Sequence, residues 1–229
     1  SAPAGAQGVR DALDLLVAKG RIPPEEDLEV VVLTGDGSAY GMGLAATSGA
    51  IDRGLDFIYV CYDNEGYANT GQQSSAATPH AARTATDPLA RGFPGEKKDL
   101  FAIWAANRPA YVATAVAAEP VDLARKLEKA RGLEGPRLLL VLAPCPTGWG
   151  FDPSESVEIG RLAVATGIWP LKEWQDGKVT YTKVRRPRLP VERYLERQGR
   201  FRHLFEPARD EATLAAIQAR VDAAWRGVE

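Results

Sequence analysis

Asp36 and Asn64 carry side-chain oxygens, and each lies two or three residues after a segment that is predicted to be a buried strand. The β-branched run 29–33 precedes the first, and the apolar run 57–62 precedes the second. In open parallel sheets the carboxyl ends of neighbouring strands meet at one edge, where ligands collect. Mg²⁺ binds a few protein oxygens and leaves its other positions to phosphates and water. The spacing therefore predicts a magnesium-held diphosphate at this edge.

A longer polar string makes the pattern more specific. Gly35-Asp36-Gly37, then Asn64, then Asn69-Thr70-Gly71 resemble the thiamine-diphosphate motif of 2-oxoacid:ferredoxin oxidoreductases, close to the archaeal-type pyruvate synthase β subunit. The string YDNEGYANTGQ at 62–72 carries most of this resemblance. Nearly the whole chain shares it, through KKDL at 97–100, YVATA at 111–115, APCPTGW at 143–149 and QGRF at 198–201.

The resemblance implies a ligand set for Mg²⁺. In the family, an aspartate, the side chain at the Asn position and a backbone carbonyl two residues further on bind the metal. By position these are Asp36, Asn64 and the carbonyl of Gly66. Because Asp-Gly pairs after strands are also common turn chemistry, a purely structural turn at Asp36 is the alternative.

The resemblance also assigns the rest of the cofactor site. Backbone N–H groups of the glycine turn are expected to bind the diphosphate, since glycine lets the backbone approach a ligand closely. Asn69 and Thr70 are expected near the reacting centre as catalytic residues, and an Asx turn is their alternative role. The expected cofactor-binding residues are Gly35, Asp36, Gly37, Ser38, Ala39, Asn64, Asn69, Thr70 and, for an iron-sulfur cluster, Cys145.

Cys145 would be one ligand of a [4Fe-4S] cluster. In the resembling family this cysteine is the last of four thiolates, and the other three lie upstream of the cofactor domain. Here the only other cysteine, Cys61, is predicted within a buried strand, whereas a cubane cluster needs about four ligands. We therefore expect the cluster only with cysteines not present in this chain, which is interpreted as an N-terminally truncated β subunit; cysteines from another chain, or loss of the cluster, are the alternatives. A lone cysteine is also often a small buried hydrophobe.

The function implied by the resemblance is oxidative decarboxylation of pyruvate, or a related 2-oxoacid, to acyl-CoA and CO₂, with electrons passed to ferredoxin. The expected partners are an α-type subunit that carries the pyrimidine-binding domain, the other oxidoreductase subunits, ferredoxin, coenzyme A and the 2-oxoacid. A non-oxidative thiamine-diphosphate decarboxylase or ligase subunit is one alternative, and a non-catalytic structural subunit is another.

Composition excludes several other classes. The 229 residues are 45% hydrophobic and carry 28 basic and 30 acidic side chains, a formal net charge of −2, so nothing indicates nucleic-acid binding. No apolar run reaches membrane-spanning length. Two cysteines exclude a disulfide framework and suit a reducing compartment. With no secretory signal at Ser1, a cytoplasmic location is expected.

The elements that position these residues alternate between strand and helix, which predicts an α/β fold: a parallel sheet flanked by helices, as in thiamine-diphosphate-binding pyrophosphate domains. We expect a cofactor and magnesium domain at 1–150 and a C-terminal helical extension at 151–229, packed on it and on partner subunits. Predicted strands are 29–33, 57–62, 111–116, 138–142 and an edge strand 178–183; predicted helices are 6–19, 43–53, 121–131, 154–166, 191–197 and 211–225; a functional loop spans 70–95.

Weaker candidates complete the prediction. His80 in the long loop could donate to a substrate carboxylate, although an exposed loop histidine is commoner. Arg83 in the same loop could approach an acidic partner, although one such placement is expected among 28 basic residues, and His203 is interpreted as a surface or interface residue. Trp104 and Trp149 are predicted to be core or interface aromatics.

Overall fold

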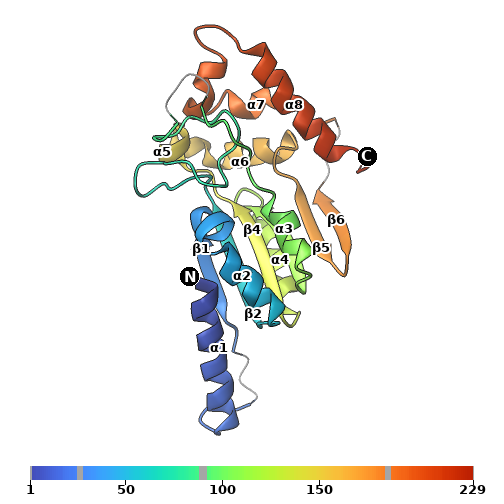
Figure 1. Ribbon diagram of the computed structural model, residues 1–229. Helices are drawn as coiled ribbons and strands as arrows, with labels where there is room; N and C mark the ends of the chain where they lie inside the picture. The colour runs from blue at the N-terminus through green and yellow to red at the C-terminus, as the bar shows by residue number, and fades with distance from the viewer. Residues whose placement is uncertain (1, 25–27, 88–91, 184–186, 229) are drawn as a thin grey trace.

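The computed structural model describes residues 2–24, 28–87, 92–183 and 187–228 (Figure 1). Within them, a six-stranded sheet has the strand order β1-β2-β4-β3-β5-β6. The strands are β1 (Val31–Gly35), β2 (Phe57–Asp63), β3 (Tyr111–Val116), β4 (Pro136–Leu142), β5 (Leu171–Gln175) and β6 (Lys178–Lys183). β1 to β4 are parallel, whereas β5 and β6 join antiparallel. The predicted α/β class is confirmed, with a mixed rather than wholly parallel sheet.

Burial explains the strand sequences. β3 and β4 are buried at every position, which matches the continuous apolar runs typical of parallel strands covered on both faces. β1 lies at the sheet edge and alternates exposed and buried residues. It begins two residues later than the predicted 29–33, so Asp36 directly follows its last residue.

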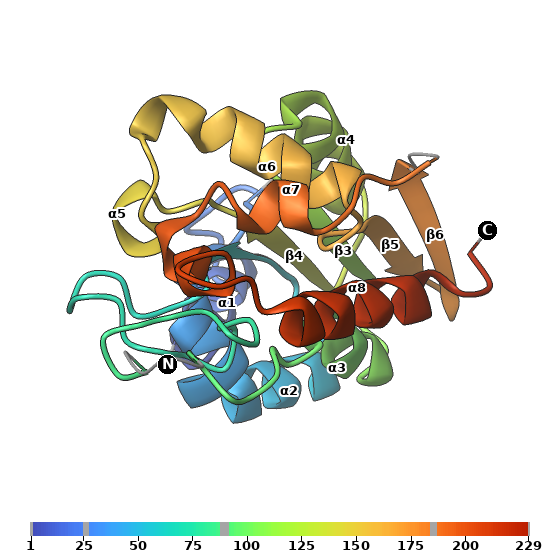
Figure 2. The ribbon, with the colours of Figure 1, turned by 90° about the horizontal axis from the view of Figure 1, so that it is seen from above.

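Helices cover both faces of the sheet (Figure 2). On one face lie α1 (Ala2–Ala18), α2 (Leu44–Asp52) and α3 (Leu100–Ala106), and on the other lies α4 (Pro120–Arg131). The helix predicted at 43–53 is preceded by a π-helical segment, Gly37–Met42, which the sequence did not indicate. α3, a short helix capped by the Asp99 side chain, was also not predicted.

The C-terminal third lies over the carboxyl ends of the parallel strands (Figure 1). It contains α5 (Pro146–Trp149), α6 (Ser156–Ala165), α7 (Glu192–Leu195), α8 (Glu211–Trp225) and short 3₁₀ helices at Pro153–Glu155 and Gly199–Leu204. The predicted extension at 151–229 is therefore not only helical, because it also supplies β5 and β6. The edge strand predicted at 178–183 is β6, whereas β5 (LKEWQ) mixes charged and apolar residues and gave no strand signal. The packing of this region on partner subunits stays a prediction.

Two clusters of buried apolar side chains pack on the faces of the sheet. The larger joins the sheet to α2, α3 and the C-terminal helices, and includes an edge-to-face contact between Tyr59 and Trp104 with ring centroids 5.3 Å apart. The smaller lies under α4. No helix in the described ranges is long and apolar enough to cross a membrane.

Candidate metal and diphosphate site

The carboxyl ends of β1 and β2 bring the predicted metal ligands together. Gly35, the last residue of β1, is in register with Tyr62 of β2, so the turns that follow the two strands are neighbours. The side-chain oxygen of Asn64 faces two other oxygens, at 2.8 Å from the Gly66 carbonyl oxygen and at 2.9 Å from Asp36 Oδ1. Asn64 thus touches both of the other groups that are predicted to bind Mg²⁺.

The spacing of these three groups suits magnesium. Oxygens this close together repel one another unless a cation lies between them, or unless a half turn of the Asn64 amide places its nitrogen there instead of its oxygen. Mg²⁺ binds oxygens at about 2.0–2.1 Å in an octahedron, whose edges are therefore about 2.9 Å long. The observed separations of 2.8 and 2.9 Å match two such edges. The residues present therefore fit the metal.

Asp36 is buried and held through its second oxygen. Its Oδ2 accepts a hydrogen bond of 2.5 Å from Ser75 Oγ, which leaves Oδ1 toward Asn64. Burial, together with the nearby Asp63 carboxylate, raises the pKa of Asp36 to about 6. Such a carboxylate, short of compensating charge, is a favourable place for a cation.

A hollow of about 280 Å³ opens beside these ligands. Most of the predicted cofactor residues line it: Gly35, Asp36, Gly37, Ser38, Asn64, Gly66, Asn69 and Thr70. Ala39 is fully buried and does not line this hollow, although it belongs to the same π-helical segment as Gly37 and Ser38. His80, Arg83 and His203 do not line it either.

The glycine at position 37 has a packing reason of its own. A Cβ added there would lie 2.1 Å from Cε1 of Tyr67, so no other residue fits without moving that ring. Tyr67 belongs to the polar string after β2. The close approach of backbone and ring locks the first turn against the second.

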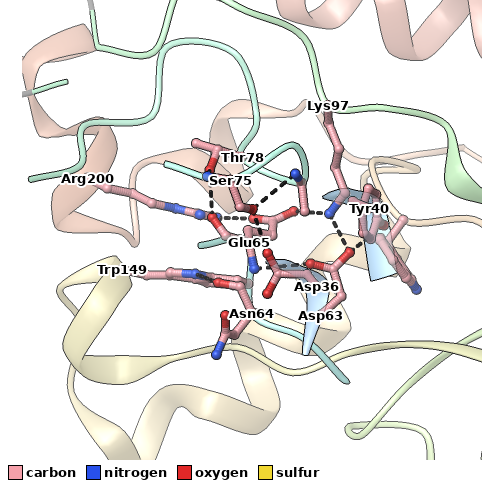
Figure 3. Close-up of polar contacts among 12 residues, drawn as sticks. Asp36, Tyr40, Asp63, Asn64, Glu65, Ser75, Thr78, Lys97, Trp149 and Arg200 are labelled. Atoms are coloured by element: carbon pink, nitrogen blue, oxygen red, sulfur yellow. Dashed lines mark hydrogen bonds and ion pairs between the residues drawn. The ribbon is translucent and has the colours of Figure 1, made fainter. Parts of the chain in front are cut away.

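A network of charged side chains surrounds Glu65, the residue that follows Asn64 (Figure 3). Lys97 Nζ lies 2.7 Å from Asp63 Oδ2 and 2.8 Å from Glu65 Oε1, and Arg200 Nη2 lies 2.6 Å from Glu65 Oε2. Tyr40 adds a hydrogen bond of 2.6 Å to Asp63 Oδ2. Burial alone would raise the pKa of Glu65, but the two cations outweigh it and lower that pKa. Glu65 therefore stays ionised inside the protein.

Trp149 closes the network on the side of the C-terminal region. Its Nε1 donates to the backbone carbonyl of Asn64 at 2.8 Å, and Cζ of Arg200 lies 3.9 Å from its ring centroid. Trp104 and Trp149 are both buried, as predicted for core aromatics. The hydrogen bond to the site was not predicted.

The two cysteines lie in different surroundings. Cys145 is half-buried at the N-terminus of α5, where its Sγ accepts a weak hydrogen bond of 3.4 Å from the Gly148 N–H. Cys61 is buried within β2, and burial raises the pKa of its thiol. Within the described part of the chain, no group of three or more His, Cys, Asp and Glu side chains is arranged to hold a metal. Cys145 as a cluster ligand stays a prediction.

The residues that support the metal ligands were not predicted from the sequence. Ser75, Lys97 and Arg200 come from the long loop, the KKDL segment and the QGRF segment. The last two segments carried the family resemblance, but it gave them no role. Arg200 lies between Gly199 and Phe201, which is a weak local signal, whereas Lys97 lies between two charged residues, Glu96 and Lys98, and has none.

The chain is similar in sequence to proteins of known families. Residues 2–141 match the family model described as "Thiamine pyrophosphate enzyme, C-terminal TPP binding domain". Pyruvate synthase subunit PorB of Methanosarcina barkeri is 47% identical over 226 residues, which cover 97% of this chain and 74% of that protein. The chain belongs to the PorB family of 2-oxoacid:ferredoxin oxidoreductase subunits.

Other PorB-family proteins and one solved structure agree with this assignment. PorB of Pyrococcus furiosus is 39% identical across all of this chain and 73% of its own length. Ketoisovalerate oxidoreductase subunit VorB of Pyrococcus horikoshii is 41% identical over 80% of this chain and 61% of its own. A 2-oxoglutarate:ferredoxin oxidoreductase from Magnetococcus marinus shares the fold, with a TM-score of 0.55 at 22% identity over 94% of this chain and 72% of that one. The predicted family and fold are confirmed.

Proposed function

We propose that this PorB-family chain is the thiamine-diphosphate-binding subunit of a 2-oxoacid:ferredoxin oxidoreductase that acts on pyruvate. The observation that carries the proposal is the meeting of Asp36, Asn64 and the Gly66 carbonyl beside a hollow at the sheet edge. The relatives named pyruvate synthase support pyruvate as the substrate, with oxidation to acetyl-CoA and CO₂ and electron transfer to ferredoxin. Membership of this family disfavours a non-oxidative decarboxylase or ligase, and the intact ligand set disfavours a purely structural subunit.

The chain's own residues hold the cofactor's diphosphate end. Asp36, Asn64 and the Gly66 carbonyl bind Mg²⁺ on one face, and the N–H groups at the start of the π-helical segment, at Gly37 and Ser38, donate to the phosphates. Thiamine diphosphate, when bound, supplies the nucleophilic carbon and the electron sink for decarboxylation. The protein thus contributes orientation and charge neutralisation.

Asn69 and Thr70 orient the reacting groups at the rim of the hollow. Thr70 is tied to Gln73, whose Nε2 donates to the Thr70 carbonyl at 2.7 Å, so this exposed turn keeps a defined shape. An amide and a hydroxyl at the rim can donate to a substrate carboxylate or carbonyl. They are the catalytic residues of the proposal.

The remaining parts of the active site come from outside this sequence. An α-type subunit supplies the pyrimidine-binding domain and the glutamate that activates the cofactor, and the C-terminal region, residues 151–229, contacts such partners. Cys145 provides one thiolate of a [4Fe-4S] cluster completed by cysteines not present here. The assembled enzyme works in the cytoplasm.

The proposal is tested by removing the Asp36 charge at nearly constant shape. In the chain assembled with its partner subunits, Asp36→Asn should weaken magnesium-dependent binding of thiamine diphosphate roughly 100-fold, about 2.8 kcal/mol. Isothermal titration calorimetry with and without Mg²⁺ measures this. Asp52→Asn, an exposed position on α2, is the matched control and should bind as the wild type does. Unchanged magnesium-dependent affinity in Asp36→Asn would remove Asp36 from the site.

A further inference from the structure

The turn that carries two of the three metal ligands has an unusual backbone. Glu65, between Asn64 and Gly66, has φ +63°, a left-handed conformation that residues with side chains rarely adopt. Such conformations persist only where the surroundings over-determine them, and they cluster at functional sites. In this turn the conformation sets the directions of the Asn64 side chain and the Gly66 carbonyl.

Contacts from distant segments hold this turn. The Glu65 N–H donates to Asp63 Oδ1 at 3.0 Å, and the Glu65 carbonyl accepts from Thr78 Oγ1 at 2.9 Å. Its carboxylate is held on both oxygens, by Lys97 and by Arg200. These contacts fix the backbone without using the groups that face Asp36.

The turn also separates two hollows. Asn64 and Gly66 line the hollow of the metal and diphosphate site, whereas Glu65 and Lys97 line a second, largely apolar one of about 290 Å³. The Glu65 side chain therefore points away from the cofactor site, as Figure 3 shows for Glu65 and Arg200. Arg200 does not line the hollow of the metal and diphosphate site.

We propose that Arg200 and Glu65 are positioning residues, which aim the Asn64 amide and the Gly66 carbonyl at the magnesium ion held by Asp36. The assignment rests on the proposed function and deepens it. Arg200 grips the turn twice: its Nη2 bonds the Glu65 carboxylate at 2.6 Å, and its guanidinium stacks on Trp149, which donates to the Asn64 carbonyl at 2.8 Å. A planar guanidinium can lie flat on the indole ring while an N–H at its edge bonds the carboxylate, whereas the ammonium of lysine has no plane to stack.

The test measures how much Mg²⁺ half-saturates the binding of thiamine diphosphate by the chain assembled with its partner subunits. Arg200→Met should raise this concentration about 10-fold or more, the range seen when groups that orient metal ligands are removed. Arg200→Lys, which keeps the charge but not the stacking, should fall between Arg200→Met and the wild type. Arg202→Met is the matched control, because Arg202 lies exposed on the same short helix and should leave the value unchanged.

A second variant separates positioning from folding. Glu65→Gly combined with Arg200→Met removes both buried charges, and glycine accepts the left-handed backbone without strain. This variant should fold yet still need about 10-fold more Mg²⁺, because the turn has lost its anchor. A wild-type magnesium requirement in it, or in Arg200→Met, would overturn the assignment and leave the proposed function standing. If the wild type and Arg202→Met show no magnesium-dependent binding, the proposed function fails, and this assignment fails with it.

Discussion

The two turns that form the site are held in different ways. The turn after β1 is fixed sterically: Gly37 lies against the ring of Tyr67, and a π-helical segment follows at once. The turn after β2 is fixed electrostatically, by buried ions that reach it from Lys97 and Arg200. The steric lock depends on one close contact between Gly37 and Tyr67, whereas the electrostatic lock depends on several ion pairs that are made with two distant segments. The two turns should therefore fail differently when they are disturbed.

The largest effect should come from the electrostatic turn. Lys97→Met leaves two buried carboxylates, Asp63 and Glu65, without their shared cation, and breaking a buried ion pair from one side costs about 3–5 kcal/mol. Urea denaturation followed by circular dichroism measures the loss of stability. Lys178→Met, at an exposed position on β6, should change it by less than about 0.5 kcal/mol. A loss below about 1 kcal/mol at Lys97 would mean that the network does not hold the second turn.

The steric turn should give an intermediate effect. Gly37→Ala forces a methyl group into the ring of Tyr67, and overpacking of this kind costs about 1–3 kcal/mol. Gly41→Ala in the same segment is the control, since the nearest atom to its added Cβ is Tyr67 Oη at 3.9 Å. Both are compared by thermal denaturation and by the affinity for thiamine diphosphate in Mg²⁺. Equal behaviour of the two variants would contradict the steric account.

The smallest effect should come from the hydrogen bond of Trp149, which joins the turn after β2 to α5. Trp149→Phe keeps an aromatic ring but removes the N–H that donates to the Asn64 carbonyl, a loss of about 1 kcal/mol beyond the change in volume. Trp104→Phe is the comparison, because Trp104 is equally buried and its Nε1 has no hydrogen-bond partner in the described residues. The difference between their unfolding free energies reports the hydrogen bond together with any weakening of the contact between Arg200 and the aromatic ring. If the two losses are the same, the bond contributes nothing.

The contrast also explains what the sequence could predict. Asp36 and Asn64 were placed correctly because parallel strands end at one edge, so two polar residues after successive strands had to be neighbours. Gly66 joined them through the family resemblance alone. The sheet and most helices followed from apolar runs, although the short α3 and the charged β5 gave too little periodicity to find.

The electrostatic support could not be predicted in the same way. Glu65 pairs with Lys97, 32 residues away, and with Arg200, 135 residues away, and no local pattern joins such positions. By residue type alone, each of them is indistinguishable from an ordinary charged residue on the surface. Only the fold shows that the three meet at one turn, where Glu65 and Arg200 are buried and Lys97 is half-buried.

In the proposed function, the three oxygens at the ends of β1 and β2 bind the magnesium of a diphosphate cofactor. A crystal structure of the assembled enzyme with thiamine diphosphate and Mn²⁺ tests it most directly, because the anomalous signal of manganese locates the ion. Below the iron absorption edge, a manganese peak is expected that is bonded to Asp36 Oδ1, the Asn64 side-chain oxygen and the Gly66 carbonyl. A bound cofactor whose metal lies away from these three oxygens would contradict it.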